Sequence, residues 1–190
     1  MGRMGSLARC WSVRLHDIPP VSVLIRRAVP GDATQIGVVH VAGWRSAYAG
    51  ILPGSSLTRL SATQQATQYD HDIRTGRAVF VAVADGVVVG FTTCGRPRTA
   101  GLGDGEVETL YVLDDWREQG LGRRLMAAAA GHLGAHGCVS LFLWVLRDNQ
   151  SRWFYERLGG RVVRTSTTPV GGVDVPQIAY VWPDLMTLAA

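Results

Sequence analysis

The chain has 190 residues, of which 47% are hydrophobic and 18% charged, so it can bury the core of one domain and is too apolar for intrinsic disorder. Its formal net charge is +4 and all 19 basic residues are arginines, which excludes a Walker-type phosphate loop and a Schiff-base enzyme, because both need a lysine. No apolar run approaches the roughly 20 residues of a membrane span.

The cysteines and the N-terminal segment bear on the compartment. Cys10, Cys94 and Cys138 are odd in number and widely separated, so neither a disulfide framework nor a thiolate zinc site is indicated. Residues 1–20 carry several arginines but no long apolar stretch, so we expect a flexible extension rather than a signal peptide. A reducing, cytoplasmic location fits these features.

The remaining residues predict alternating strands and helices. β-branched and alternating apolar runs indicate strands, and apolar residues at three-and-four spacing indicate helices. In chain order we expect a strand at 21–28, a helix at 36–47, a helical stretch at 55–74, strands at 79–84, 87–93 and 106–112, a helix at 120–136, a strand at 139–145, a helix at 149–158, and strands at 161–168 and 175–182.

Turn and capping residues support these boundaries. Asp32, after Pro30-Gly31, is expected to cap the first helix, and the second helical stretch should break near Ser61. Asp85-Gly86 is a strong hairpin signal. Helices interrupt a sheet that contains both hairpins and crossovers, so the fold class is α/β (α+β) with one sheet, in a single domain over 21–184 with a tail at 185–190.

A strand, a tight turn and a glycine-bearing helix start over residues 110–126 carry the clearest chemical signal. The first turn of a helix offers unpaired N–H donors and the positive end of the helix dipole, and Gly120 and Gly122 let an anion approach the backbone. Arg117, Arg123 and Arg124 add positive charge. Alternatively, the glycines only make a tight turn.

Other familiar sites do not fit the residues. The glycines at 101–105 and 120–122 lack the third glycine of a dinucleotide fingerprint, so a nicotinamide cofactor is not expected. His132 and His136 have helical spacing but no third ligand, so no metal is expected. A Gly-x-Ser-x-Gly nucleophile elbow is also absent from the sequence.

Two ordered motifs resemble a known superfamily. Arg117-x-x-Gly120-x-Gly122 after a strand is similar to the Arg/Gln-x-x-Gly-x-Gly/Ala signature of the GNAT superfamily of acyl-CoA-dependent N-acetyltransferases. The segment from Asn149 to Gly159, Asn-Gln-Ser-Arg-Trp-Phe-Tyr-Glu-Arg-Leu-Gly, resembles the family's Asn-x-x-Ala-x-x-Phe-Tyr-x-x-x-Gly, with Arg152 where alanine is common. Stretches at 44–53 and 171–176 are similar to a bacterial subgroup, and the resemblance covers about residues 22–182.

The resemblance implies a mixed, mostly antiparallel sheet of about seven strands, splayed between the fourth and fifth, with acetyl-CoA in the gap. It implies no metal. The pantetheine amides would pair with the backbone of Leu110, Tyr111 and Val112, and Asn149 would bond the cofactor arm or, alternatively, cap the next helix. The pyrophosphate would be held by amides of Arg117, Glu118, Gln119, Gly120, Leu121, Gly122 and Arg123.

The family's usual mechanism, direct attack of an amine on the thioester, implies a base and an acid. Glu106 and Glu108 lie two apart on one face of a strand, where their like charges are expected to repel each other, and both are candidates for the base. Glu106 is favoured by its offset from the cofactor strand, and a solvated strand edge is the alternative. Tyr155 is the candidate acid that protonates the departing thiolate, and plain core packing is its alternative.

The acceptor is expected to be a primary amine of a small molecule or a peptide. Trp44, Tyr48 and Trp144 are candidates for lining its pocket, or they pack in the core. The arginines are scattered and no recognition motif is present, so we expect neither nucleic acid nor membrane as partner. A homodimer stays open, and so does a non-catalytic acyl-CoA sensor or structural subunit with the same fold.

Overall fold

The structure is a computed structural model that describes residues 22–188. The expected N-terminal extension, residues 1–20, lies outside the described residues. All eleven expected elements are present, and the helical stretch at 55–74 is divided in two. The elements are β1 (Val23–Arg27), α1 (Ala33–Ala47), α2 (Gly54–Thr58), α3 (Ala62–Arg74), β2 (Ala78–Ala84), β3 (Val87–Gly95), β4 (Gly105–Val112), α4 (Leu121–Ala135), β5 (Leu141–Leu146), α5 (Arg152–Arg157), β6 (Arg161–Val170) and β7 (Val173–Trp182).

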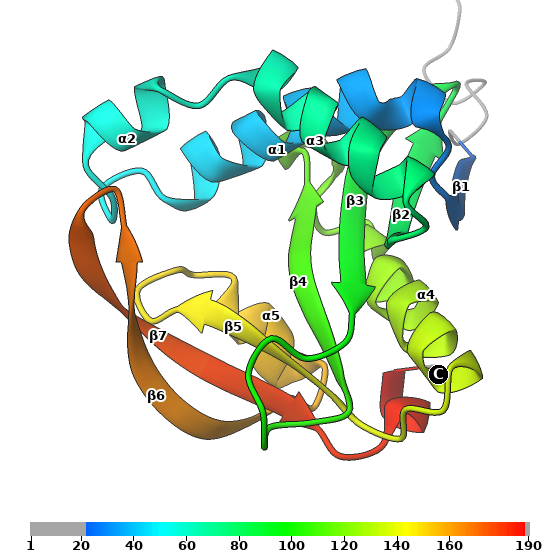
Figure 1. Ribbon diagram of the computed structural model, residues 1–190, viewed down its shortest axis with the longest axis vertical. Helices are drawn as coiled ribbons and strands as arrows, with labels where there is room; N and C mark the ends of the chain where they lie inside the picture. The colour runs from blue at the N-terminus through cyan, green and yellow to red at the C-terminus, as the bar shows by residue number, and fades with distance from the viewer. Residues whose placement is uncertain (1–21, 189–190) are drawn as a thin grey trace, which may run out of the picture.

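The seven strands form one sheet in the order β1-β2-β3-β4-β5-β7-β6. Every neighbouring pair is antiparallel except β4 and β5, which are parallel. Figure 1 shows β4 and β5 diverging, with β5, β6 and β7 turned away from β1 to β4. The expected α/β class, strand number and splay are therefore confirmed.

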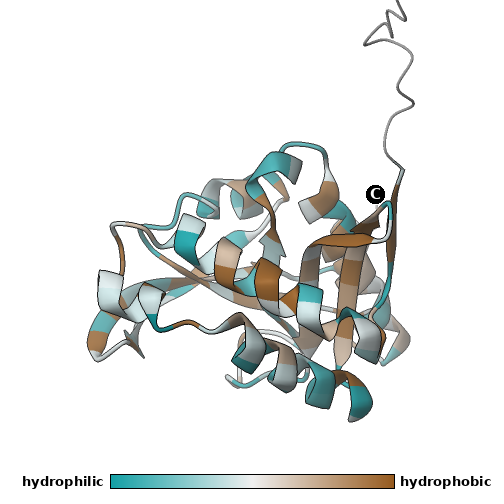
Figure 2. Ribbon diagram, turned by 90° about the horizontal axis from the view of Figure 1, so that it is seen from above, coloured by the Kyte–Doolittle hydropathy of each residue, from teal (hydrophilic) through white to brown (hydrophobic). Residues whose placement is uncertain are grey.

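Helices cover both faces of the β1 to β4 half because its strands alternate their apolar side chains. Val81 and Phe91 pack with Ile36 of α1 and Tyr69 of α3. The neighbouring Ala82 points to the other face, where it packs with Leu121 and Leu125 of α4. Figure 2 shows hydrophobic residues along the strands and in stripes on the helices.

Local chemistry explains the element boundaries. Ser61 caps α3 by accepting a hydrogen bond from the Gln64 N–H, so the expected break near Ser61 is confirmed. The hairpin turn holds Asp85 and Gly86 at positive φ, 47° and 81°, which is the geometry of a two-residue hairpin turn. The α5 helix is shorter than expected because the chain turns at 149–151 before it begins.

Two expectations need correction. Asp32 precedes α1 but its side chain makes no cap bond there; the carboxylate instead accepts from the Arg26 guanidinium at 2.7 and 2.8 Å and from the Val29 N–H. The expected tail at 185–190 begins as a 3-10 helix, Leu185–Leu188, whose Leu185 and Leu188 are buried against α4. Apolar side chains at its two ends draw this segment onto the core.

Candidate functional site

The central feature is the fork where β4 and β5 separate. In the described part of the chain these strands pair only at Gly105 with Leu141 and at Glu106 with Phe142. Farther along, residues 109–112 of β4 remain paired with β3, so the opposite backbone edge faces the opening. An unpaired strand edge can receive an extended ligand with amide groups, as an added strand would. Leu110, Tyr111 and Val112 lie on this edge.

The end of β4 leads into a turn that presents backbone N–H groups. The loop places Glu118 and Gly120 in the left-handed region, at φ 61° and 76°, and Gly120 begins α4 without a side-chain cap. A Cβ at Gly120 would meet open space. The start of α4 therefore presents backbone N–H donors beside a space that an anion can enter, next to Gly120.

The arginines of this loop are more engaged than the sequence indicated. The Arg117 guanidinium pairs with Asp114 at 2.8 Å and donates to Ser46 of α1. The Arg124 guanidinium donates to the Val23 carbonyl of β1 at 2.6 Å. These contacts tie the loop and α4 to their neighbours, so the backbone amides carry more of the anion-binding capacity than these two side chains.

Gly122 has a packing role that the sequence did not reveal. A Cβ at this position would lie 2.9 Å from the ring of Phe154 in α5, closer than carbon atoms can approach. Its absence lets α4 and α5 come together below the fork. Close helix packing is thus a firm reason for glycine at 122, beside any approach of a phosphate.

Three tyrosines from different elements converge on the fork. The Tyr48 hydroxyl, after α1, lies 3.5 Å from that of Tyr111 in β4, and Tyr111 also interacts electrostatically with Tyr155 of α5. Burial is the main reason why the pKa values of all three are raised. Each phenol therefore stays protonated at neutral pH and is available as a proton donor.

Asn149 connects this cluster to α5. Its side-chain oxygen accepts from the Ser151 N–H at 2.8 Å, so it shapes the turn before the helix, while Ser151 takes the N-cap position. The Asn149 side chain also bonds Tyr48, which works against the rise in the Tyr48 pKa. Asn149 is buried, and its cap-like contact and its place beside the fork coexist.

The expected acceptor residues are only partly brought together. Trp44 and Tyr48 meet edge to face, with ring centroids 4.9 Å apart, and both pack against the buried cluster of Leu52, Leu146 and Val175. Trp144 instead packs with Leu102 and its neighbours. Trp44 and Tyr48 thus share one apolar end of the fork, and Trp144 belongs to the adjacent cluster.

This apolar end is closed by two segments distant in sequence. The tip of the β6–β7 hairpin abuts α2, since a Cβ at Gly171 would collide with Ser56, and Figure 1 shows the two segments side by side. In the described residues, Trp44 Nε1 and Ser56 Oγ are buried without a hydrogen-bond partner. Unpaired buried donors are costly, so these two atoms are available to a ligand that reaches this end.

Glu106 and Glu108 do not form the like-charged pair that was expected, because each has its own arginine partner. Glu106 is only 1% exposed, and its carboxylate accepts from the Arg98 backbone N–H at 2.7 Å and from its guanidinium at 2.6 and 3.1 Å. Glu108 instead pairs with Arg77. A solvated strand edge is therefore the wrong description of Glu106, which lies at the last β4–β5 pair.

A bulge in β4 explains why the two carboxylates have different partners. Thr93 of β3 pairs with Thr109, but the next residue, Cys94, pairs with Val107. Glu108 is the extra residue, so the regular alternation expected to put it on the same face as Glu106 is interrupted.

Three features of the candidate site were not predicted from the sequence. Arg98 comes from a loop, and no local pattern connects it to Glu106. For Tyr111, the sequence predicted only a backbone contact with the cofactor and gave its side chain no role. His40, buried under Trp44, bonds the Tyr69 hydroxyl at 2.7 Å, and burial lowers the pKa of His40 to about 4; its spacing of four from Trp44 is the signal that could have found it.

Residues 22–188 contain neither a metal-binding cluster nor a membrane-spanning helix. No group of three or more side chains there is arranged to hold a metal ion. None of the helices in that part of the chain has the length and apolar character needed to cross a bilayer.

Comparison with known proteins agrees with this geometry. Residues 44–160 match the Acetyltransferase (GNAT) family. The chain is 34% identical over 168 residues to an uncharacterized N-acetyltransferase of Bacillus subtilis (strain 168), YuaI, covering 87% of this chain and 96% of that protein.

Solved structures share the fold. An acetyltransferase from Salmonella typhimurium, YncA, solved with its cofactor acetyl-CoA, superposes with a TM-score of 0.63 at 19% identity, covering 86% of this chain and 94% of that one. The PaiA N-acetyltransferase from Thermoplasma acidophilum, solved with coenzyme A, gives 0.61 at 19% identity, covering 83% and 98%. With the family match, the close relative and the forked sheet, the chain belongs to the acetyltransferase (GNAT) family and is an acetyl-CoA-dependent N-acetyltransferase.

Proposed function

We propose that the protein transfers the acetyl group of acetyl-CoA to a primary amine by direct attack of the amine on the thioester. The observation that carries this proposal is the fork itself. The unpaired edge of β4, the uncapped start of α4 and the mutually interacting Tyr48, Tyr111 and Tyr155 support it.

The residues present fit acetyl-CoA, which supplies an activated acyl group. The edge at Leu110, Tyr111 and Val112 would pair with the pantetheine amides, and the open space at Gly120 leaves room for the pyrophosphate beside the backbone at the start of α4. The Arg117 N–H, expected in the same set, instead donates to the Asp114 carbonyl oxygen at 3.1 Å. Asn149 would orient the arm from the other side of the fork.

Transfer requires two proton movements, and we assign each to a side chain. As the amine nitrogen bonds the carbonyl carbon and the carbon–sulfur bond breaks, the Tyr155 hydroxyl gives its proton to the sulfur, and solvent reprotonates the phenolate. The proton lost from the amine goes to Glu106, directly or through one water. Glu106 is buried at the last β4–β5 pair, where the two strands begin to separate, and this position supports the role. Glu108 is the second candidate.

The acceptor is proposed to enter at the apolar end formed by Trp44 and Tyr48. Aromatic walls and the unpaired Nε1 of Trp44 favour an amine whose body is apolar or aromatic and carries a hydrogen-bond acceptor.

The test is calorimetric titration of acetyl-CoA followed by turnover with a panel of small amines and peptides. Binding with product formation is expected. Tight binding without turnover on any amine would favour the sensor or structural-subunit alternative, and no binding at millimolar acetyl-CoA would contradict the assigned fork site.

A further inference from the structure

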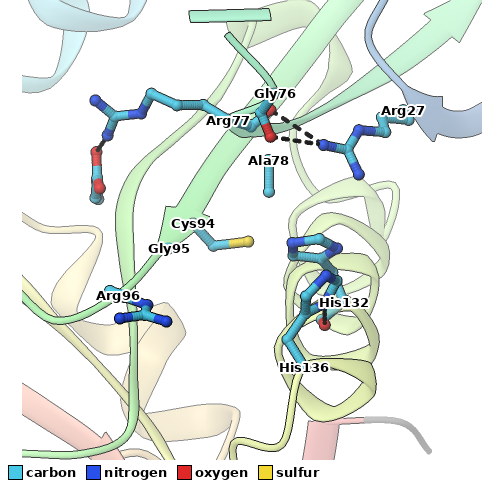
Figure 3. A pocket seen from close by; sticks show the side chains of 10 residues that line it. Arg27, Gly76, Arg77, Ala78, Cys94, Gly95, Arg96, His132 and His136 are labelled. Carbon is cyan, nitrogen blue, oxygen red and sulfur yellow. Dashed lines mark hydrogen bonds and ion pairs between the residues drawn. The ribbon is translucent and has the colours of Figure 1, made fainter.

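A cavity lies away from the fork's open edge, toward the C-terminal end of α4. Its volume is about 520 Å³, within the roughly 300–1,000 Å³ typical of small-molecule sites. It opens where β2 begins and β3 ends, beside the last turns of α4 (Figure 3). His132 lies ten residues beyond Gly122 on α4, about 15 Å along the helix axis. The lining residues are Arg27, Gly76, Arg77, Ala78, Cys94, Gly95, Arg96, Glu108, His132 and His136.

Positive charge dominates this lining. Three guanidinium groups face one carboxylate, Glu108, and that carboxylate already pairs with Arg77. Asp72, 3.9 Å from the Arg77 guanidinium, is a further partner of the same arginine. The charges of Arg27 and Arg96 are thus left to the cavity, because neither forms an ion pair with any residue from 22 to 188.

The backbone holds Arg27 at the rim. Its Nη2 donates to the carbonyl oxygens of Gly76 at 2.9 Å and Arg77 at 3.4 Å. These bonds fix the guanidinium while leaving its other nitrogens available. Figure 3 shows Arg27 and Arg96 on opposite sides of the opening, with the Cys94 thiol and the two imidazoles between them. A ligand between the two arginines would meet donors from both sides.

The histidines add donors on a third side. Their ring centroids are 4.2 Å apart, and His136 Nδ1 bonds the His132 carbonyl oxygen at 2.8 Å. Burial and the nearby His136 and Arg27 lower the pKa of His132. A negative charge in the cavity would oppose that effect and favour a protonated imidazole as an additional donor.

We propose that this cavity binds a phosphate group through Arg27, Arg96 and His132. Guanidinium groups donate in pairs to phosphate oxygens, and such charge-assisted bonds are stronger than neutral ones. The phosphate can be the free ion or part of a phosphorylated small molecule, since the cavity has room for more than the ion. The cavity shares Glu108, the second candidate for the base, with the proposed transfer site, but phosphate binding through Arg27, Arg96 and His132 does not depend on the transfer mechanism.

The test follows the imidazole signals of the full-length protein by NMR during titration with inorganic phosphate, with His132→Gln to assign the signal. Phosphate should raise the pKa of His132 in a saturable way, while chloride at matched ionic strength should not. Glycerol 3-phosphate and succinate are titrated in parallel. Tighter binding of glycerol 3-phosphate than of phosphate identifies a phosphorylated small molecule as the ligand, and equal binding identifies the free ion.

Arg96→Gln should weaken phosphate binding about 10- to 100-fold, the loss expected for charge-assisted bonds to one guanidinium. Arg157→Gln, an exposed arginine of α5 outside the cavity, is the matched control and should bind as wild type. Because Arg96 is exposed in a loop, the variant should keep its melting temperature. The proposal is wrong if chloride shifts His132 equally, if succinate binds as tightly as phosphate, or if Arg96→Gln binds phosphate unchanged.

Discussion

The Tyr155 hydroxyl offers the sharpest test of the proposed mechanism. Tyr155→Phe removes one oxygen and keeps the ring, which packs against Phe154, Tyr180 and Trp182 with centroids 5.2, 6.0 and 6.3 Å away. The apolar burial of the side chain is retained, so the free energy of unfolding should change by no more than about 1 kcal/mol. Any larger effect must come from the chemistry of the hydroxyl.

If Tyr155 protonates the thiolate, kcat should fall by about 10²- to 10⁴-fold, the contribution of a placed general acid. That range corresponds to about 3–5 kcal/mol of activation free energy. The dissociation constant of acetyl-CoA should stay near wild type. Because burial raises the pKa of Tyr155 above its ordinary value of about 10, the wild-type kcat should not fall through phenol ionisation up to pH 10.

Tyr180→Phe is the matched control. Tyr180 is buried in the same cluster, but its hydroxyl donates to Glu156 at 2.6 Å, so its loss should lower the melting temperature and leave kcat intact. For both variants, kcat is measured at saturating acetyl-CoA and amine by chromatographic detection of the acetylated amine. This assay avoids thiol reagents, which would also react with the protein's cysteines. A Tyr155→Phe kcat within threefold of wild type would refute the general-acid role.

Three further predictions concern the carboxylates, the α4 start and the buried histidine. Glu106→Gln should lower kcat by about 10²-fold or more if Glu106 is the base, with Glu108→Gln as comparison; a kcat near wild type in the first and a collapse in the second would transfer the role to Glu108. Gly122→Ala should destabilise the fold by roughly 1–3 kcal/mol in thermal unfolding, because the added Cβ would collide with the Phe154 ring. An unchanged melting temperature would show that α4 and α5 readily separate. Burial lowers the pKa of His40 to about 4, against an ordinary 6.5, so between these pH values the unfolded chain binds a proton that the folded chain does not. The free energy of unfolding is therefore full above pH 6.5 and falls by about 3 kcal/mol as the pH drops to 4. In chemical denaturation, the stability difference between wild type and His40→Gln should shrink over that range, and a constant difference would contradict the assignment.

Much of the architecture followed from local patterns in the chain. Alternating apolar residues, Asp85-Gly86 and Ser61 marked strands, a hairpin turn and a helix cap, because these features depend on neighbours within a few residues. The glycine-bearing helix start after β4 was equally local, since unpaired N–H groups arise at any helix N-terminus. The sequence alone therefore predicted the elements, the family resemblance and the glycine-bearing helix start at the end of the fork.

The electrostatics of the site depended on contacts between segments far apart in the chain. Arg98 forms an ion pair with Glu106, and Arg77 forms one with Glu108, 31 residues away in the chain. The two carboxylates therefore belong to separate ion pairs and do not form the mutually repelling pair that was expected. The bulge that separates them arises from the register of β3 against β4, and register depends on pairing rather than on either strand alone.

Packing likewise decided which aromatic residues share a surface. Trp44 and Tyr48 pack against the cluster that contains Leu146, whereas Trp144, two residues earlier on β5, joins another cluster. Gly122 faces Phe154, a contact that no spacing rule reveals. The sequence determined which groups were available, and the tertiary structure decided their partners, because burial and charge pairing are properties of surfaces that only folding brings together.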